Sequence, residues 1–342
     1  MIFNLETIVR KNILSLKPYS SARDEFSGKD GVFLDANENP FGELNRYPDP
    51  YQRELKQNLG QLKKISSENV FIGNGSDEVI DLTYRIFCEP DKDNVIICPP
   101  TYGMYEVSAN INDVAIQKVD LLPEVFQLDT DKILAAINKN TKLIFVCCPN
   151  NPTGNSVKWA DIKKILENFN GIVVVDEAYI DFASYQSLIT QLPNYSNLLI
   201  MQTFSKAWGL AGARVGIAYA DAKIISLFNK VKPPYNVSEL NQKAVLKALG
   251  NYPEFEKNKK IILKEKELII NKLKELPKVK KIHPSEANFL LVEVENADKI
   301  YNELVAQKII TRNRNNVVKN CIRITIGSPE ENQKLIEALN KI

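Results

Sequence analysis

Residues 171–176 read GIVVVD, an apolar run that ends in an aspartate. The apolar residues are continuous rather than alternating, which is typical of a parallel strand that is buried on both faces. Asp176 would then stand at the carboxyl end of a central strand, where an ionised side chain is costly without a partner. The stretch therefore predicts a layered α/β fold and a polar site at one edge of its sheet.

Similar runs precede and follow this one along the chain. Amphipathic stretches such as SDEVIDLTYRIF (76–87) and WADIKKILENF (159–169) lie between them and have a helical pattern. Because strands and helices alternate, we expect an α/β fold with a mostly parallel sheet flanked by helices. The other runs are NVFIG (69–73), NVIIC (94–98), KLIFVCC (142–148), NLLIM (197–201) and RVGIAYA (214–220).

The pattern changes after about residue 235. Residues 254–276 form a long charged stretch whose lysines alternate with glutamates, which is typical of a solvated helix face. It is followed by the apolar runs 287–294 and 321–327, a helical stretch around 297–306 and a last helix from about 329. These elements predict a smaller C-terminal α+β domain.

We expect two domains. The larger covers residues 36–245, and the smaller comprises residues 1–35 together with 246–342, because the N-terminal residues carry no sheet core of their own.

Composition excludes several classes of function. Lys and Arg total 44 against 42 Asp and Glu, so no charge excess favours a nucleic-acid partner. No apolar run reaches the roughly 20 residues of a membrane helix, and the N-terminus lacks a signal-peptide core. We therefore expect a cytoplasmic protein.

The cysteines and the histidine argue against a metal site. The five cysteines form no C-x-x-C pair, and the adjacent Cys147 and Cys148 lie in an apolar run, as small core residues do. His283 is the single histidine and precedes Pro284, so we interpret it as a bystander at a turn. No bound metal is expected.

The stretch GNGSDEV (73–79) leaves a strand and opens a helix. Ser76 is a suitable N-cap, Asp77 and Glu78 suit the first turn, and the free N–H groups could bind a phosphate. An ordinary capped helix explains the stretch equally well. It is not the dinucleotide fingerprint, because Glu78 stands where a third glycine is required.

Two further polar groups are expected at the same sheet edge. Asp176 either caps the following segment or pairs with a cation, such as the protonated ring nitrogen of a cofactor. The stretch CCPNNPTGN (147–155) follows an apolar run and is rich in turn-forming residues. It is either a bare turn or a rigid turn that presents an asparagine amide to a ligand.

The stretch TFSKAWGLAGARVG (203–216) places Lys206 at the end of another strand. A lysine in an apolar cleft has a lowered pKa and can form a Schiff base with an aldehyde. Thr203, Ser205 and Arg214 could surround a phosphate. An amine, a carboxylate, an amide and a phosphate site together are the groups that pyridoxal 5′-phosphate requires.

These stretches make the chain resemble the fold-type I pyridoxal-phosphate aminotransferases. Within them it is similar to the histidinol-phosphate group, because of LDANENPFG (34–42) and RYPDP (46–50). The resemblance runs nearly end to end, and its other motifs are KPYSSAR (17–23), NGSDEVID (74–81), TYGMY (101–105), PNNPTGN (149–155), VVDEAYIDF (174–182), TFSKAWGLAGARVG (203–216), PPYNVS (233–238) and CIRITIGS (321–328).

The resemblance implies roles around the cofactor ring. Lys206 would hold the cofactor as a Schiff base and act as the base of a 1,3-proton shift. Asp176 would pair with the pyridine nitrogen and keep it protonated, so that the ring accepts electrons. Tyr179 and Asn151 would hydrogen-bond the phenolate oxygen of the ring, and Tyr102 would stack on its face.

The resemblance also implies how the cofactor phosphate is held. Tyr47 would reach it from the other subunit, so a homodimer is implied. The residues expected to hold the phosphate from within the chain are Ser76, Asp77, Glu78, Thr203, Ser205 and Arg214.

At the substrate end, Tyr19, Arg312 and Arg323 would bind the phosphate of one substrate and the carboxylate of glutamate. Arginine suits both tasks because its planar fork fits either anion. Arg314 lies in the short loop between the two arginines, so the sequence leaves open whether Arg312 or Arg314 points into the site. We expect Arg314 to be a solvated loop cation, because most arginines are exposed.

The implied reaction is amino transfer between L-histidinol phosphate and 2-oxoglutarate, which gives imidazole acetol phosphate and L-glutamate. The nearest alternatives share the scaffold: a phosphoserine- or phosphothreonine-type decarboxylase, or another phospho-amine or aromatic aminotransferase. A ligand-sensing regulator is disfavoured, because the motifs begin at about residue 17 and leave no room for a DNA-binding module before them.

Overall fold

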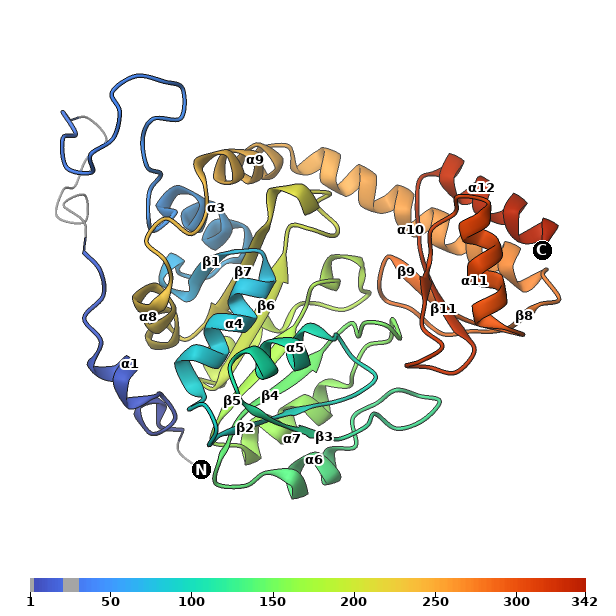
Figure 1. The fold of residues 1–342 in the computed structure, drawn as a ribbon, viewed down its shortest axis with the longest axis horizontal. Helices are drawn as coiled ribbons and strands as arrows, with labels where there is room; N and C mark the ends of the chain where they lie inside the picture. The colour runs from blue at the N-terminus through green and yellow to red at the C-terminus, as the bar shows by residue number, and fades with distance from the viewer. Residues whose placement is uncertain (1–2, 21–30) are drawn as a thin grey trace.

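The computed structural model describes residues 3–20 and 31–342. Within them, the larger of two sheets has seven strands in the order β1-β7-β6-β5-β4-β2-β3 (Figure 1). Strands β3, β2, β4, β5 and β6 run parallel, whereas β7 is antiparallel to both β6 and β1. The strands are β1 (Val70–Asn74), β2 (Asn94–Ile97), β3 (Ala115–Lys118), β4 (Thr141–Cys147), β5 (Ile172–Asp176), β6 (Leu198–Thr203) and β7 (Val215–Ala220).

Both faces of this sheet are buried, as the continuous apolar runs predict. In β5, Val173 and Val175 pack with the apolar side chains of α3, α6, α7 and α9, whereas Ile172 and Val174 pack with α4, α5 and α8. The predicted mostly parallel α/β sheet is thus confirmed. The helices of this layer are α3 (Arg53–Lys63), α4 (Ser76–Phe87), α5 (Met104–Ile111), α6 (Thr130–Ala136), α7 (Trp159–Asn168), α8 (Ala222–Val231) and α9 (Glu239–Gly250).

Short 3₁₀ segments connect several of these elements. They are η1 (Leu5–Thr7), η2 (Ser67–Asn69), η3 (Ile180–Phe182), η4 (Leu188–Asn194) and η5 (Ala211–Ala213).

The C-terminal residues build a second, antiparallel sheet, which in the described chain has four strands in the order β10-β11-β9-β8. Helices α11 and α12 pack with it around a separate apolar cluster. This is the smaller α+β unit predicted from the sequence. Its elements are β8 (Val279–Ile282), β9 (Phe289–Val294), α11 (Ala297–Ala306), β10 (Arg312–Asn313), β11 (Cys321–Thr325) and α12 (Pro329–Lys341).

One long helix, α10 (Tyr252–Lys274), runs from the larger body to the smaller one (Figure 1). Near its start, Phe255 packs with Ala207 and Phe289 beside the turn that carries Lys206. Near its end, Ile269 and Leu273 belong to the core of the smaller unit. The helix therefore connects the two cores.

The N-terminal residues contact the larger body. Ile8, Val9 and Ile13, the last in α1 (Lys11–Ser15), pack against the α4 side of the larger sheet, and Arg10 forms an ion pair with Glu89 at 3.3 Å. The division into residues 36–245 and 1–35 plus 246–342 stays a prediction. None of the helices in the described ranges has the length and apolarity needed to cross a membrane.

The carboxyl ends of the parallel strands meet at one edge of the larger sheet. Cys147 at the end of β4 is in register with Asp176 at the end of β5, and Asp176 is in register with Met201 in β6. Lys206 follows β6 by three residues. The topology thus brings the aspartate and the lysine to the same edge.

Candidate active site

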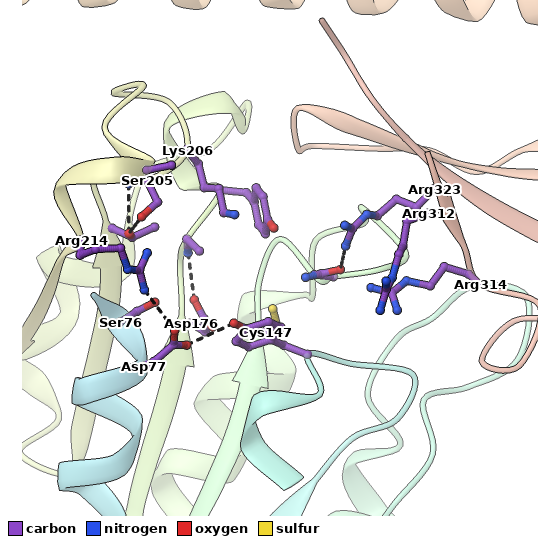
Figure 2. A pocket seen from close by; sticks show the side chains of 16 residues that line it. Ser76, Asp77, Cys147, Asp176, Ser205, Lys206, Arg214, Arg312, Arg314 and Arg323 are labelled. Atoms are coloured by element: carbon purple, nitrogen blue, oxygen red, sulfur yellow. Dashed lines mark hydrogen bonds and ion pairs between the residues drawn. The ribbon is translucent and has the colours of Figure 1, made fainter. Parts of the chain in front are cut away.

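A cavity of about 440 Å³ opens at this edge, and the smaller sheet borders its other side (Figure 2). Its walls therefore come from both sheets. The residues that line it are Ser76, Asp77, Tyr102, Cys147, Asn151, Asp176, Ala178, Tyr179, Thr203, Ser205, Lys206, Ala211, Arg214, Arg312, Arg314 and Arg323.

Asp176 is the buried acid of the cavity, with only 4% of its surface exposed. Its Oδ1 accepts a hydrogen bond from the backbone N–H of Ala178 at 3.0 Å, and its Oδ2 accepts one from the Tyr105 hydroxyl at 2.6 Å. Burial raises the pKa of this carboxyl, while the two hydrogen bonds and the charge of Lys206 oppose the rise. An acid in this setting favours a cationic ligand.

Lys206 is the amine of the cavity and lies in the turn after β6. Its Nζ sits over the ring of Tyr179, 5.7 Å from the ring centre. The side chain is accessible from the cavity, yet the surrounding walls exclude enough water to lower its pKa, and the charge of Arg323 lowers it further. A lowered pKa increases the fraction of free amine at neutral pH, which is the nucleophilic form.

The first turn of α4 and the turn before β7 form a polar cup on one side of Lys206. Arg214 bonds Asp77 through Nη2 and Oδ2 at 3.2 Å, and Thr203 donates to the Ser205 hydroxyl at 3.0 Å. A Cβ on Gly216 would lie 2.2 Å from the Ser76 nitrogen, so only glycine allows β7 to approach the start of α4 this closely. The cup offers backbone N–H groups, hydroxyls and a guanidinium, which are the donors of an anion site.

Gly75 occupies the N-cap position of α4, so the prediction of Ser76 as N-cap is wrong. Gly75 has φ 78°, and a Cβ there would meet the Arg214 guanidinium at 2.6 Å. The cap position therefore requires glycine, and Ser76 moves into the first turn, where its hydroxyl faces the cavity.

Two tyrosines and an asparagine form the middle of the cavity. Tyr102 donates from its hydroxyl to Asp77 Oδ1 at 3.2 Å, and Tyr179 is held edge-on against Phe289 with ring centres 5.1 Å apart. Asn151 is buried in the turn after β4, and its Oδ1 accepts from Arg323 Nη1 at 2.5 Å. This contact joins the turn of the larger sheet to the smaller sheet.

Three arginines of the smaller sheet form the far end of the cavity. Arg312 and Arg323 are register partners in β10 and β11, and Arg314 follows directly after β10. Within the described ranges, no carboxylate forms an ion pair with any of them, and the Nε groups of Arg314 and Arg323 are buried without a hydrogen-bond partner. Burial, together with Arg323 and Arg312, lowers the pKa of Arg314 to about 10. Such a cluster favours an anion of more than one charge.

The expectation that Arg314 is a solvated loop cation is wrong. The side chain is partly buried and lines the cavity beside Arg312 (Figure 2). Its backbone N–H bonds the Cys321 carbonyl at 2.9 Å, which continues the pairing with β11 and keeps the residue at the cavity.

Three residues expected at the site lie outside the cavity. Glu78 accepts a hydrogen bond from the Asn74 backbone and another from Asn236 at 2.8 Å, so its carboxylate supports the loop before α4. Tyr19 is 69% exposed, and Tyr47 is 49% exposed and stacks on Tyr235 with ring centres 4.3 Å apart. Residues 21–23 of the KPYSSAR motif lie outside the described residues.

The sequence interpretation missed four residues at or beneath the cavity. Cys147, Ala178 and Ala211 line it, and Tyr105 bonds Asp176 from below. Cys147 and Tyr105 stand in stretches that were singled out, CCPNNPTGN and TYGMY, but each looks like an ordinary core residue in sequence. His283 does not line this cavity; it is buried against Phe126 with ring centres 5.3 Å apart.

Comparison with known proteins agrees with this geometry. The sequence model of the family described as aminotransferase class I and II matches residues 28–339. The chain belongs to this aminotransferase family. The histidinol-phosphate aminotransferase of Cytophaga hutchinsonii is 50% identical over 346 residues, covering 99% of each chain. The family resemblance seen in the sequence is confirmed.

Solved structures of other aminotransferases share the fold. The histidinol-phosphate aminotransferase from Clostridium acetobutylicum superposes with a TM-score of 0.80 at 24% identity, covering 87% of this chain and 90% of that chain. The enzyme of the same name from Sinorhizobium meliloti, solved in complex with pyridoxal 5′-phosphate, has a TM-score of 0.79 at 23% identity, covering 86% and 82%. At these identities the likeness shows the fold alone.

Proposed function

We propose that this aminotransferase moves the amino group of L-histidinol phosphate to 2-oxoglutarate, giving imidazole acetol phosphate and L-glutamate. The observation that carries the proposal is a single cavity with a reactive amine and a buried acid at one end and, at the other, three arginines that form no ion pair with a carboxylate of the described residues. Relatives about 50% identical over their full length carry the name of this activity.

The cofactor is pyridoxal 5′-phosphate, and the residues fit it. Asp176 is a buried acid that favours a cationic partner, Lys206 is an accessible amine with a lowered pKa, and the cup at Gly75 and Gly216 offers anion donors. When bound, the cofactor supplies an aldehyde that captures the amino group and a protonated ring that withdraws electrons from the reacting carbon. The side chains of the protein bind and orient the ligands and move the proton.

Lys206 is the residue that removes and returns the proton at the reacting carbon of the substrate. Its lowered pKa keeps a fraction of the amine unprotonated at neutral pH, as a general base requires. Asp176 would pair with the ring nitrogen and keep it protonated, and Tyr179 and Asn151 would hydrogen-bond the phenolate oxygen of the ring. Tyr102 would stack on the ring.

The cup holds the cofactor phosphate. Ser76, Thr203, Ser205 and Arg214 contribute hydroxyls and the guanidinium, and the first turn of α4 contributes backbone N–H groups. The Asp77 carboxylate faces Arg214 and Tyr102. A carboxylate repels a phosphate, so Asp77 takes part through its backbone N–H while its side chain orients Arg214.

The arginine end binds the substrate anions in turn. Arg312 and Arg323 bind the phosphate of one substrate and the side-chain carboxylate of glutamate in the other half-reaction, so one pocket serves a ping-pong sequence. Tyr19 lies outside the cavity of this chain, so its role at this end stays a prediction.

The working form is a homodimer in the cytoplasm. Tyr47 lies outside the cavity of its own chain and is half exposed, which supports a role at the phosphate of the neighbouring subunit. The five free, buried cysteines suit a reducing compartment.

A substrate panel tests the proposal. Purified protein loaded with pyridoxal 5′-phosphate is assayed with histidinol phosphate, phosphoserine and phenylalanine as amino donors, with 2-oxoglutarate as acceptor. We expect the highest kcat/KM for histidinol phosphate. Release of carbon dioxide from phosphoserine or phosphothreonine without amino transfer would instead identify a decarboxylase, and a preference for phenylalanine an aromatic aminotransferase.

A further inference from the structure

Tyr105 lies beneath the cavity in α5 and contacts the acid of the site. Its side chain is completely buried, and its hydroxyl donates to Asp176 Oδ2 at 2.6 Å. The other oxygen, Oδ1, accepts from the Ala178 backbone. Each carboxylate oxygen thus has one protein donor and still has a free lone pair for a ligand.

The phenol stays protonated and can therefore donate to Asp176. Burial and the neighbouring Asp176 charge raise the pKa of Tyr105 well above its ordinary value, so the hydroxyl keeps its proton at every working pH. Burial is the largest influence that raises the pKa of Asp176, and the Tyr105 hydrogen bond is the strongest influence that opposes it. Of the other titratable groups near Asp176, Lys206 favours its ionised form and Asp77 disfavours it. The raised pKa values of Tyr102, Cys147 and Tyr179 keep these three neighbours protonated and neutral.

The position of the hydroxyl is fixed from several sides. The Tyr105 ring stacks on Phe145 with centres 4.8 Å apart and meets Tyr102 edge-on at 5.6 Å. The Tyr84 hydroxyl donates to the Tyr105 backbone carbonyl at 2.8 Å. The donor is therefore oriented before any ligand enters the cavity.

We propose that Tyr105 is a positioning residue that keeps Asp176 ionised and in one orientation, so that the proton shared with the cofactor ring stays on the ring nitrogen. A proton between two bases remains on the stronger one, and a hydrogen bond to Oδ2 makes the carboxylate the weaker base. Loss of the phenol proton donor would shift the shared proton toward Asp176 and leave the ring less electron-withdrawing. The inference rests on the proposed function for the identity of the cofactor.

The test compares Tyr105→Phe with Tyr219→Phe. Both replacements remove one buried hydroxyl and keep the ring, but only the first removes a donor to Asp176, because the Tyr219 hydroxyl has no hydrogen-bond partner among the described residues. The first measurement uses protein without cofactor, labelled with ¹³C at aspartate carboxyl carbons, with the Asp176 signal assigned by Asp176→Asn. We expect Asp176 in Tyr105→Phe to take up its proton at a pH higher by about one unit, and Tyr219→Phe to titrate like the unmodified chain.

Loaded enzyme gives the second measurement. In Tyr105→Phe we expect kcat to fall on the order of tenfold while both KM values change by less than about twofold, because the substrate contacts are intact. The double variant with Asp176→Asn should be no slower than Asp176→Asn alone, since Tyr105 acts through that carboxylate.

An unchanged Asp176 titration in Tyr105→Phe would overturn the inference. The result is separable from the proposed function. If the titration shifts but the unmodified enzyme does not accept histidinol phosphate, the substrate assignment fails and the role of Tyr105 stands. If the enzyme accepts that substrate and the titration does not shift, only the role of Tyr105 fails.

Discussion

The two ends of the cavity are built in opposite ways. At the larger sheet, Asp176 is buried with a protein donor on each oxygen, and Arg214 is paired with Asp77. At the smaller sheet, Arg312, Arg314 and Arg323 converge, and no acid of the described residues pairs with them. At the larger sheet these charged side chains have protein partners, whereas at the smaller sheet the arginines have no acidic partner among the described residues.

This difference indicates what each end binds. Groups with satisfied hydrogen bonds and fixed rings suit a resident cofactor, which must be held in one geometry through every turnover. Unpaired cations suit anions that enter and leave, because each anion supplies the charge that the protein lacks. The predictions below test this division, from the largest expected effect to the smallest.

Lys206→Ala should have the largest effect, because it removes the amine on which the cofactor end depends. We expect kcat to fall by at least about 10²–10⁴-fold and the near-visible absorbance of the bound cofactor to be lost. Lys247→Ala is the control, since Lys247 lines a neighbouring cavity on the other side of the same turn. Retained absorbance in Lys206→Ala would mean that another lysine holds the cofactor.

Arg323→Ala should weaken the binding of both substrates at the arginine end of the cavity. We expect KM to rise about tenfold or more for histidinol phosphate and also for glutamate, because one fork binds both anions. Cofactor absorbance should remain. A rise in only one of the two KM values would contradict the shared use of this arginine.

Arg314→Gln should affect the binding of the phosphate substrate more than the binding of glutamate. A phosphate carries more charge than a carboxylate, so removal of one of three cations should raise KM for histidinol phosphate about tenfold and that for glutamate by less. Lys319→Gln provides the control, because Lys319 is an exposed cation on the same loop that does not line the cavity. Equal rises for both substrates would argue against a dianion-specific role.

The rate at which protein without cofactor takes up pyridoxal 5′-phosphate should depend on pH through Lys206. The lowered pKa means that free amine forms at a lower pH than for an ordinary lysine, so the rate should rise with pH and level off early. The charge of Arg323 contributes to the lowering, so Arg323→Gln should move the midpoint to higher pH. A stopped-flow pH series measures both midpoints, and an identical midpoint would rule out coupling between the two ends.

Tyr47→Phe should have the smallest effect. One hydroxyl contact to the cofactor phosphate corresponds to about a fivefold weaker Kd, with kcat nearly unchanged. Equilibrium dialysis of the protein measures it, and Tyr235→Phe controls for the ring stack that the two tyrosines share. Unaltered cofactor affinity would count against a role for Tyr47 across the subunit boundary.

The sequence predicts the cofactor end of the site well, for a physical reason. Parallel strands place their carboxyl ends at one edge, so polar residues that end apolar runs, such as Asp176 and Lys206, must lie close together. The strands are predictable because they are buried on both faces and therefore appear in the sequence as continuous apolar runs. β3 was not predicted, because its residues, AIQK at 115–118, are partly exposed at the sheet edge and carry no apolar run.

The arginine end is less predictable. The position of Arg314 at the cavity depends on the two-residue strand β10 and on its pairing with β11. No local sequence pattern indicates this short strand. Tyr105 was missed for a different reason: a buried tyrosine on an amphipathic helix resembles core packing until its hydroxyl is seen to meet Asp176. Tyr19 and Tyr47 lie outside the cavity of this chain, and the role implied for Tyr47 requires a second subunit, so both assignments stay predictions.

Helix α10 has a mechanical consequence for the distance between the two anion pockets. Its 23 residues span about 34 Å. The first turn of α10 packs against the turn that carries Lys206, where the ring centres of Trp208 and Phe255 lie 4.0 Å apart. A pivot of about 5° at this stack would carry the distal end of the rod through roughly 3 Å. The distance between the two ends of the cavity therefore depends in part on this aromatic stack, whose rings do not line the cavity.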